Sequence, residues 1–352
     1  MKNPILVVLI GMVFLSSFSK AESGDGTGLQ LSTAGDIVGS LSKDGKNKLE
    51  VREAEFLVFA PIDHYFDGVL NLAAHQENGA ALFEIHELTI GSTKLIPRSR
   101  FRVGQYFLGI GRLNQFHRHD WVFTSAPKVQ SEFLHSEGLN DTGIEYGYLL
   151  PIPFYLDLTV GVTNGWVFGH AHTEGSKPYF PTHYARLATY NGLFANGGMQ
   201  TGINYLGRTD NQGTKTSLFG LDLTAKWKEA SVLKFLFQSE GWYRIKTPSS
   251  GVSEGAIGFY LFPQYAFTST LQLGVRFDGF TITTLQDATG AQIANFDYAM
   301  VPTLTYKASE FSTIRASYNF KGTRFQGQTI NSEQVFELQA VFILGSHPAH
   351  DF

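Results

Sequence analysis

The chain has 352 residues, of which 16% are charged and 14% aromatic, with no cysteine and a net charge of −4 at pH 7. This composition excludes a disordered chain, a disulfide scaffold and a cysteine-based zinc fold. Nucleic acid is not an expected partner, because 27 basic residues against 31 acidic ones leave no basic surplus. The many aromatic side chains require either a large buried core or a surface that faces lipid.

Residues 1–21 have the features of a cleaved secretory signal peptide. Lys2 gives a positive start, residues 5–15 are apolar, and Ser19 and Ala21 are small residues just before the expected cleavage point. The apolar stretch is shorter than the roughly 20 residues that a membrane-spanning helix needs, and no later stretch approaches that length. The sequence therefore predicts an exported chain that either stays soluble or inserts as a barrel.

Apolar and polar residues alternate along most of the remaining chain. Within 219–227 the odd positions are apolar, whereas the even positions are Gly, Asp, Thr and Lys, and 271–278 and 314–321 repeat the pattern. Such alternation is typical of strands with two different faces. The segments are about 10–15 residues long, which suits tilted strands that cross a bilayer. We predict about sixteen of them, the even number expected of a bacterial outer-membrane barrel. Their expected ranges are near 28–41, 48–60, 66–76, 81–92, 99–112, 141–150, 154–166, 184–193, 198–208, 215–227, 231–246, 254–266, 270–284, 293–306, 310–322 and 332–345.

The predicted connections favour the same architecture. The predicted periplasmic links, such as 151–153 and 228–230, are short, while the long links 113–140 and 167–183 fall on the outward side. Whether the link 113–140 stays outside or folds into the lumen is left open by the sequence. A soluble β-sandwich is the alternative, but its strands would be shorter and its polar face more charged. We expect a transmembrane antiparallel β-barrel without a plug domain.

The expected organisation is a signal peptide (1–21), an outer-membrane β-barrel (22–346) and a periplasmic C-terminal tail (347–352). The expected partners are outer-membrane lipid, the barrel-assembly machinery and small solutes or metal ions. Porins are commonly trimers, but no sequence feature marks a subunit interface, so a homotrimer stays an open alternative.

Charged residues of both signs occupy the inward-facing strand positions. Sixteen strands are enough to leave an aqueous channel, which these side chains would line. Pairing across strands to brace a polar wall is the alternative role for each of them. The predicted pore-lining residues are Glu53, Glu55, Glu84, Asp157, Asp222, Lys234, Arg276 and Arg315.

Six of the eleven histidines lie in the two long links, four of them as the pairs His117–His119 and His170–His172. In an extended backbone, residues i and i+2 project to one side, so both rings of a pair can reach one ion. Imidazole and carboxylate groups suit Zn²⁺, whereas isolated loop histidines are usually only polar surface residues. The predicted metal ligands, on external loops at the pore mouth, are His117, His119, Asp120, His135, His170, His172 and His183. His347 and His350 in the tail are a further candidate pair.

Several segments resemble a group of bacterial outer-membrane proteins described as zinc-regulated outer-membrane receptors. The segments that carry this likeness are 97–105, 111–121 with its His-Arg-His-Asp block, 124–129, 149–165, 181–186 and the His-Pro-Ala-His end. More distantly, residues 48–114 resemble the phosphate-selective porin-like family, although that family's basic phosphate ladder has no counterpart here. The resemblance implies a role in zinc uptake or zinc limitation. Energy-coupled receptors have a roughly 22-stranded, plugged barrel, so passive or facilitated passage is the expected mode here.

Three function classes follow from these observations. The first is a porin-like channel linked to zinc, with Zn²⁺ transported or bound by the loops, and the second is a general small-solute diffusion porin without a metal site. The third is a membrane-embedded hydrolase that combines His119 and Asp120 with Ser125 or Ser131, but neighbours in sequence do not establish a catalytic geometry. We expect a channel and no enzymatic activity.

Overall fold

The computed structural model describes residues 28–77, 80–165, 180–193, 196–230, 232–284, 295–325 and 328–345. The expected signal peptide and the tail that contains His347 and His350 lie outside these residues. Among the described residues, no helix combines the length and the apolar character needed to cross a membrane.

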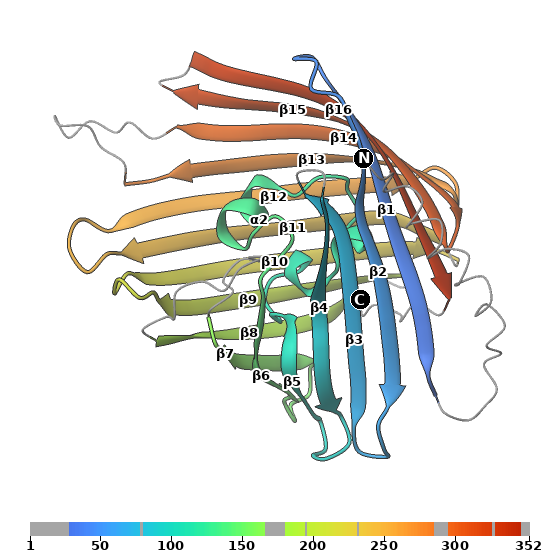
Figure 1. The fold of residues 1–352 in the computed structure, drawn as a ribbon, viewed down its shortest axis with the longest axis vertical. Coiled ribbons are helices and arrows are strands. Elements are labelled where there is room, and N and C mark those ends of the chain that lie inside the picture. The colour runs from blue at the N-terminus through green and yellow to red at the C-terminus, as the bar shows by residue number, and fades with distance from the viewer. Residues whose placement is uncertain are drawn as a thin grey trace.

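Sixteen antiparallel strands form one closed barrel, in which each strand pairs with its neighbours in sequence and β1 pairs with β16 (Figure 1). The strands are β1 (Gln30–Ser42), β2 (Lys48–Pro61), β3 (Asp67–Glu77), β4 (Ala80–Ser92), β5 (Ser99–Phe107), β6 (Asn140–Leu149), β7 (Leu156–Thr163), β8 (Phe180–Leu193), β9 (Gly197–Thr209), β10 (Lys215–Glu229), β11 (Val232–Thr247), β12 (Glu254–Ala266), β13 (Leu271–Ile282), β14 (Phe296–Ser309), β15 (Ser312–Phe325) and β16 (Gln328–Gly345). The predicted fold class and strand number are confirmed.

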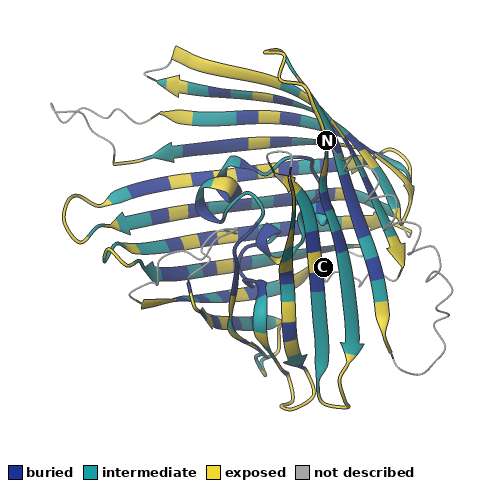
Figure 2. Ribbon diagram, in the orientation of Figure 1, coloured by how far each residue is buried: buried dark blue, intermediate teal, exposed yellow. Residues whose placement is uncertain are grey.

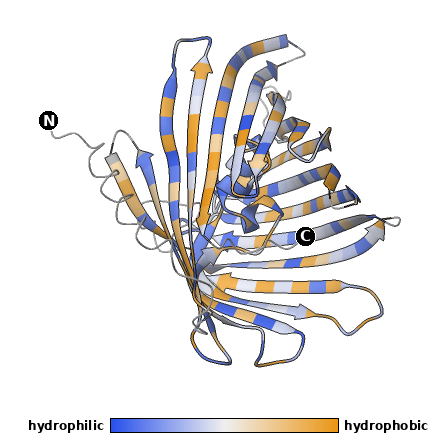
Figure 3. Cartoon of the chain, turned by 90° about the vertical axis from the view of Figure 1, so that its right-hand side faces the viewer, coloured by the Kyte–Doolittle hydropathy of each residue, from blue (hydrophilic) through white to orange (hydrophobic). Residues whose placement is uncertain are grey.

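The two faces of the wall have opposite chemistry, as the bands along the strands in Figures 2 and 3 show. On β10, Leu221 faces outward and is 64% exposed, whereas its neighbour Asp222 faces the lumen and is 3% exposed. A soluble protein buries its apolar side chains, but here large apolar residues cover the outside and polar residues are buried within. This distribution is that of a barrel that faces lipid outside and is polar inside.

The long connections lie at one end of the barrel, which we call the outer end. They join β5 to β6 (108–139), β7 to β8 (164–179) and β13 to β14 (283–295), whereas the links at the opposite, inner end are short. Most predicted strand boundaries lie within a few residues of the observed ones. The expected strand 99–112 is too long, because β5 ends at Phe107 and the chain then turns away from the wall.

Residues 108–139, called the lumen loop below, fold into the barrel rather than extending outside it. The loop contains the short helices η1 (Leu113–Gln115), η2 (Arg118–Asp120) and α2 (Lys128–Phe133), and α2 lies inside the barrel in Figure 1. Its backbone turns inward through Gly111, which has a φ of +62°, and a Cβ there would approach Glu240 on β11. The sequence leaves open whether this link enters the lumen, and the structure shows that it does; the expectation that its histidines lie on an external loop at the pore mouth is wrong.

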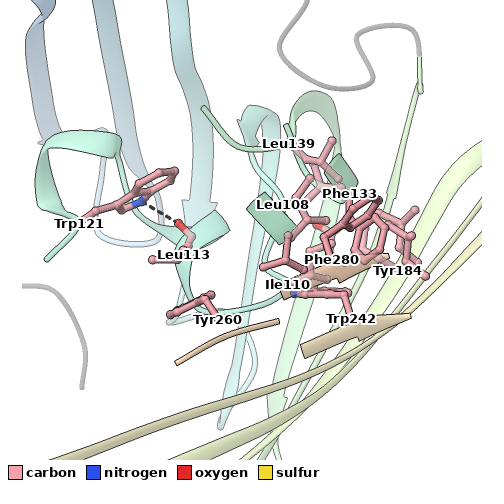
Figure 4. Packing of buried hydrophobic residues seen from close by; sticks show 14 of the residues in the cluster. Leu108, Ile110, Leu113, Trp121, Phe133, Leu139, Tyr184, Trp242, Tyr260 and Phe280 are labelled. Atoms are coloured by element: carbon pink, nitrogen blue, oxygen red, sulfur yellow. Dashed lines mark hydrogen bonds between the residues drawn. The ribbon is translucent and has the colours of Figure 1, made fainter. Parts of the chain in front are cut away.

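An apolar core holds the lumen loop against one side of the barrel. Trp121, Phe123 and Phe133 are at most 4% exposed and pack with inward residues such as Tyr260 and Phe280 (Figure 4). The Trp121 ring also donates a hydrogen bond to the carbonyl oxygen of Leu113 at 3.2 Å, drawn as a dashed line in the same figure. Because each buried aromatic side chain is worth several kcal/mol, this packing fixes the loop strongly.

Polar contacts fix the loop around much of the circumference. The backbone N–H of Leu113 donates to Glu240 on β11 at 2.8 Å, and Thr124 donates to Glu337 on β16 at 2.7 Å. Arg244, also on β11, donates to the carbonyl oxygen of Glu132 at 3.0 Å. The loop thus contacts walls that are far apart in sequence and crosses the lumen between them.

The predicted pore-lining residues are largely paired with other side chains. Arg100 binds Asp157 through two hydrogen bonds of 2.8 and 2.6 Å, and Arg186 donates to Asp222 at 2.7 Å. Three more of these residues have partners: Arg276 bonds to Asp278, Arg315 to Gln339, and Lys234 lies 3.6 Å from Glu229. Glu53, Glu55 and Glu84 belong to a different arrangement.

Candidate metal site in the lumen

Strands β2, β3 and β4 bring acidic and histidine side chains together on the inner wall. Glu53 and Glu55 project from β2, His75 from β3, and Glu84 and His86 from β4. The strand pairing changes register at His86, because Asn71 of β3 pairs with Glu87 while Leu72 pairs with Ile85. Such a β-bulge re-aims side chains. It allows the consecutive residues His86 and Glu87 both to reach the lumen side, which strict alternation would prevent.

The lumen loop adds two histidines to this wall. His117 precedes the short helix η2 and His119 lies within it; their rings stack against each other, with centroids 5.8 Å apart. The His117 ring also stacks on His86 of β4 at 5.8 Å. We call the combined group the lumen cluster; its members are Glu53, Glu55, His75, Glu84, His86, Glu87, His117, His119 and Asp120.

Three imidazole rings turn the same nitrogen toward one carboxylate. The Nδ1 atoms of His117, His86 and His119 lie 3.1, 3.5 and 3.5 Å from Oε1 of Glu55. Ligands about 2.0–2.1 Å from a tetrahedral Zn²⁺ are themselves roughly 3.3–3.4 Å apart, so these separations match ligand spacing. The ligand atoms of Glu55, His86 and His117 all lie within 4.8 Å of one another, as do those of Glu53, Glu55 and His119.

Each of the three rings has a second carboxylate at its other nitrogen. Nε2 lies 3.1 Å from Glu84 in His86, 3.1 Å from Glu87 in His117, and 3.5 Å from Asp120 in His119. In metal sites, a carboxylate commonly holds the non-ligating nitrogen of a histidine, which fixes the ring and makes the ligating nitrogen more basic. The lumen cluster has this pattern three times.

A further ligand set lies beside the first, entirely on the wall. Nδ1 of His75 is 3.2 Å from Oε1 of Glu84, and Nε2 of His86 is 3.1 Å from the same oxygen. His75, Glu84 and His86 also have ligand atoms within 4.8 Å of one another. His86 thus belongs to two ligand sets and faces each of them with a different nitrogen.

The charge of the cluster favours a cation. Five carboxylates, those of Glu53, Glu55, Glu84, Glu87 and Asp120, surround the four rings. The Glu53 side chain is only 10% exposed, and its buried Oε2 atom has no hydrogen-bond partner among the described residues. Buried carboxylates so close together require a proton or a cation between them.

The neighbouring carboxylates raise the pKa values of the two loop histidines. Burial alone would lower the pKa of His117, yet the neighbouring Glu55 and Glu87 raise it well above its ordinary value. Burial also opposes protonation of His119, but Asp120 and Glu55 raise its pKa to about 9. Without a metal, protons can therefore balance the cluster's negative charge, and a metal ion would replace them.

The structure places the predicted ligands in different environments. His117, His119 and Asp120 lie inside the barrel, not on an external loop at its mouth. His135 follows α2 and belongs to none of the ligand groups found among the described residues. His183 projects from the outer face of β8 against Phe180 and Tyr205.

Two of the predicted ligands, His170 and His172, lie outside the described residues. Sequence reasoning also did not include the wall histidines His75 and His86 among the ligands. The alternation of Phe83, Glu84, Ile85 and His86 gives the one usable signal, since it places a carboxylate and an imidazole on the same face.

The serines considered for a hydrolase have other partners. The Ser125 hydroxyl donates to Asn319 at 3.0 Å and accepts from Arg276 at 3.2 Å, and the Ser131 hydroxyl donates to the carbonyl oxygen of Pro127. Neither arrangement prepares a nucleophile beside His119.

A polar cavity of about 260 Å³ adjoins the cluster. Glu87, Arg102, Gln115 and Glu145 are among the residues that line it. Glu87 also contacts His117, so the cavity borders the cluster directly.

Comparisons with known proteins agree with the fold. No family model matches the chain. A protein of Aquifex aeolicus described as uncharacterized is 27% identical over 339 residues, which cover 87% of this chain and 71% of that protein.

Solved structures with the same architecture include outer-membrane channels. The channel DcaP of Acinetobacter baumannii superposes with a TM-score of 0.63 and 11% identity, over 91% of this chain and 98% of that one. The anion-selective porin from Comamonas acidovorans gives 0.62 and 9%, over 90% and 99%. A loop-deleted OmpT, an outer membrane protein of Vibrio cholerae, gives 0.62 and 10%, over 91% and 100%. At these identities the likeness shows a porin-type barrel fold.

Proposed function

We propose that this protein is an outer-membrane channel that captures Zn²⁺ in its lumen and lets it pass toward the periplasm. The observation that carries the proposal is the convergence of three histidine Nδ1 atoms on the Glu55 carboxylate, each ring being backed by a carboxylate of its own. Imidazole and carboxylate ligands suit Zn²⁺, which here is the cargo of the channel. The resemblance to proteins described as zinc-regulated points in the same direction.

The barrel architecture supports the membrane part of the proposal. An apolar outer surface, a polar interior and sixteen strands are the features of an outer-membrane porin. Export through the expected signal peptide and insertion by the barrel-assembly machinery belong to this proposal. A homotrimer also belongs to it, because OmpT of Vibrio cholerae has been solved in a trimer form; chemical cross-linking in native membranes tests that assembly.

Planar-bilayer recording tests the channel and its metal together. We expect the purified barrel to conduct K⁺ and Cl⁻, and micromolar Zn²⁺ to reduce that current, because a bound divalent ion in the constriction slows other cations. His117→Ala and Glu55→Gln should each strongly weaken the effect of micromolar Zn²⁺. His64→Ala is the matched control, since His64 lies in the exposed turn between β2 and β3. If Zn²⁺ leaves the wild-type current unchanged, the zinc proposal is wrong.

General diffusion of small solutes is the second candidate function. One observation favours it: His117 lies 3.1 Å from both Glu55 and Glu87, and His119 lies 3.5 Å from Glu55 and Asp120, so these contacts can dock the lumen loop on the wall without a metal. In that case His117→Ala changes the conductance itself, and neither protein responds to Zn²⁺.

A further inference from the structure

The two nitrogens of His86 face different ligand sets. Nε2 lies toward Glu84 and belongs with His75, which we call the outer set (His75, Glu84, His86). Nδ1 lies 3.5 Å from Glu55 and belongs with His117, which gives the inner set (Glu55, His86, His117). One imidazole is therefore shared between two places where a metal ion can bind.

A shared imidazole restricts how the two sets can be filled. A neutral histidine carries a proton on one ring nitrogen and offers a lone pair on the other. Neutral His86 can bind an ion through Nε2 or through Nδ1. It can bind through both only if the ring also loses its one remaining N–H proton. Occupation of the outer set and of the inner set through His86 is thus mutually exclusive.

The two sets follow each other along the barrel. Glu84 pairs with Ala73, and His75 lies two residues nearer the outer end of β3. Glu55, on the other side of β3, pairs with the same residue, Ala73. The loop residue His117 contacts Glu87, and Glu87 pairs with Asn71, which is nearer the inner end of β3. The outer set therefore lies closer to the outer end, and the inner set leads on to the cavity beside Glu87.

The two sets also differ in composition. The outer set consists of wall residues alone, and the side chains of His75 and Glu84 are 11% and 19% exposed. The inner set needs His117 of the lumen loop, whose side chain is 14% exposed, together with Glu55, whose side chain is only 3% exposed. The outer set can therefore hold an ion without any ligand from the loop.

We propose that His86 transfers a divalent transition-metal ion from an outer entry site, formed with His75 and Glu84, to an inner site formed with Glu55 and His117. This inference rests on the proposed function and adds the order in which the ion meets its ligands. In the transfer, the bond from the metal to Nε2 breaks and a bond to Nδ1 forms. The proton that leaves Nδ1 is replaced by one taken up at Nε2 from water, so the ring stays neutral. Two overlapping sites allow an ion to bind and still move on, as conduction requires.

Zn²⁺ binding kinetics on the full-length barrel in detergent test the order. Stopped-flow mixing with a chromophoric zinc chelator gives association rates, and equilibrium competition with the same chelator gives affinities. His75→Ala removes the outer set alone, Glu55→Gln disables the inner set, and His86→Ala removes both. His64→Ala again serves as the control for loss of a histidine.

The transfer model predicts a separate result for each variant. His75→Ala should keep the equilibrium affinity within about twofold but slow association about tenfold, because an entry site that concentrates ions raises the on-rate by at least that factor. Glu55→Gln should retain rapid but weak binding, and His86→Ala should lose both phases.

The two proposals fail in different ways. If wild type binds Zn²⁺ and His117→Ala does not, while His75→Ala associates as fast as wild type, the transfer model is overturned and the proposed function stands. Loss of all binding in Glu55→Gln also overturns the transfer. If wild type binds no Zn²⁺, or His117→Ala binds as tightly as wild type, the proposed function itself fails.

Discussion

At the scale of single residues, the carboxylates behind the rings distinguish a metal site from a chance group of histidines. Glu87 and Asp120 contact the Nε2 atoms of His117 and His119, on the side of each ring that faces away from Glu55. Holding a ring in this way keeps its other nitrogen aimed at the ion and increases its basicity. Their contribution should therefore appear in the affinity for metal.

We expect Glu87→Gln and Asp120→Asn each to weaken Zn²⁺ binding about 10- to 100-fold, the usual cost of losing such a partner. Isothermal titration of the detergent-solubilised barrel measures the change. Glu310→Gln, in the exposed turn between β14 and β15, is the matched control and should bind as wild type does. Affinities unchanged in both cluster variants would mean that these carboxylates do not support a metal site.

At the scale of elements, the lumen loop joins the apolar core of the barrel to the candidate metal site. Its buried aromatic residues pack on the inner faces of β11, β12 and β13, while its histidines meet β2 and β4 on the other side. The apolar core positions the loop, and the loop supplies His117 and His119 to the candidate metal site. Weakening the core should therefore affect both the pore and the metal.

Phe123→Ala tests this connection. Phe123 is fully buried and contacts Tyr260 and Phe262 through edge-to-face ring contacts of 5.7 and 5.3 Å. Truncation should cost about 3–5 kcal/mol of packing, enough to free the loop from the wall. We expect a higher single-channel conductance and a lower affinity for Zn²⁺. Phe219→Ala removes the same side chain from the outer face, where Phe219 is 47% exposed, and should change neither quantity.

The same elements show which features the sequence could predict. The alternation along β10 is local, so strands and their inward residues followed directly from it. The length of the link 113–140 places it on the outward side but does not decide whether it enters the lumen, although Trp121, Phe123 and Phe133 are unusual residues for an exposed loop. The sequence does not predict that His86 and Glu87 both face the lumen, because a β-bulge leaves no clear signal in a single alternating segment.

At the scale of the whole molecule, the scarcity of charge has a direct explanation. A barrel wall has one lipid-facing side chain for each inward one, so about half of the strand positions must be apolar. The few charges that remain are concentrated inside, where Arg186 pairs with Asp222 and Arg276 with Asp278 along the inner wall. The aromatic residues divide between the outer surface and the core that holds the lumen loop.

A charge on the outer face should therefore be costly in proportion to its depth. Leu221 lies near the middle of β10 and is 64% exposed, so in a membrane its side chain contacts hydrocarbon. We expect Leu221→Arg to lower the free energy of unfolding by about 2–4 kcal/mol, the range for arginine at the bilayer midplane. Val252→Arg is the control, because Val252 is 88% exposed in the link between β11 and β12. Reversible denaturant unfolding in lipid vesicles measures both. Equal stability of the two variants would contradict a lipid-facing wall, since in water an exposed leucine can be replaced by arginine at little cost.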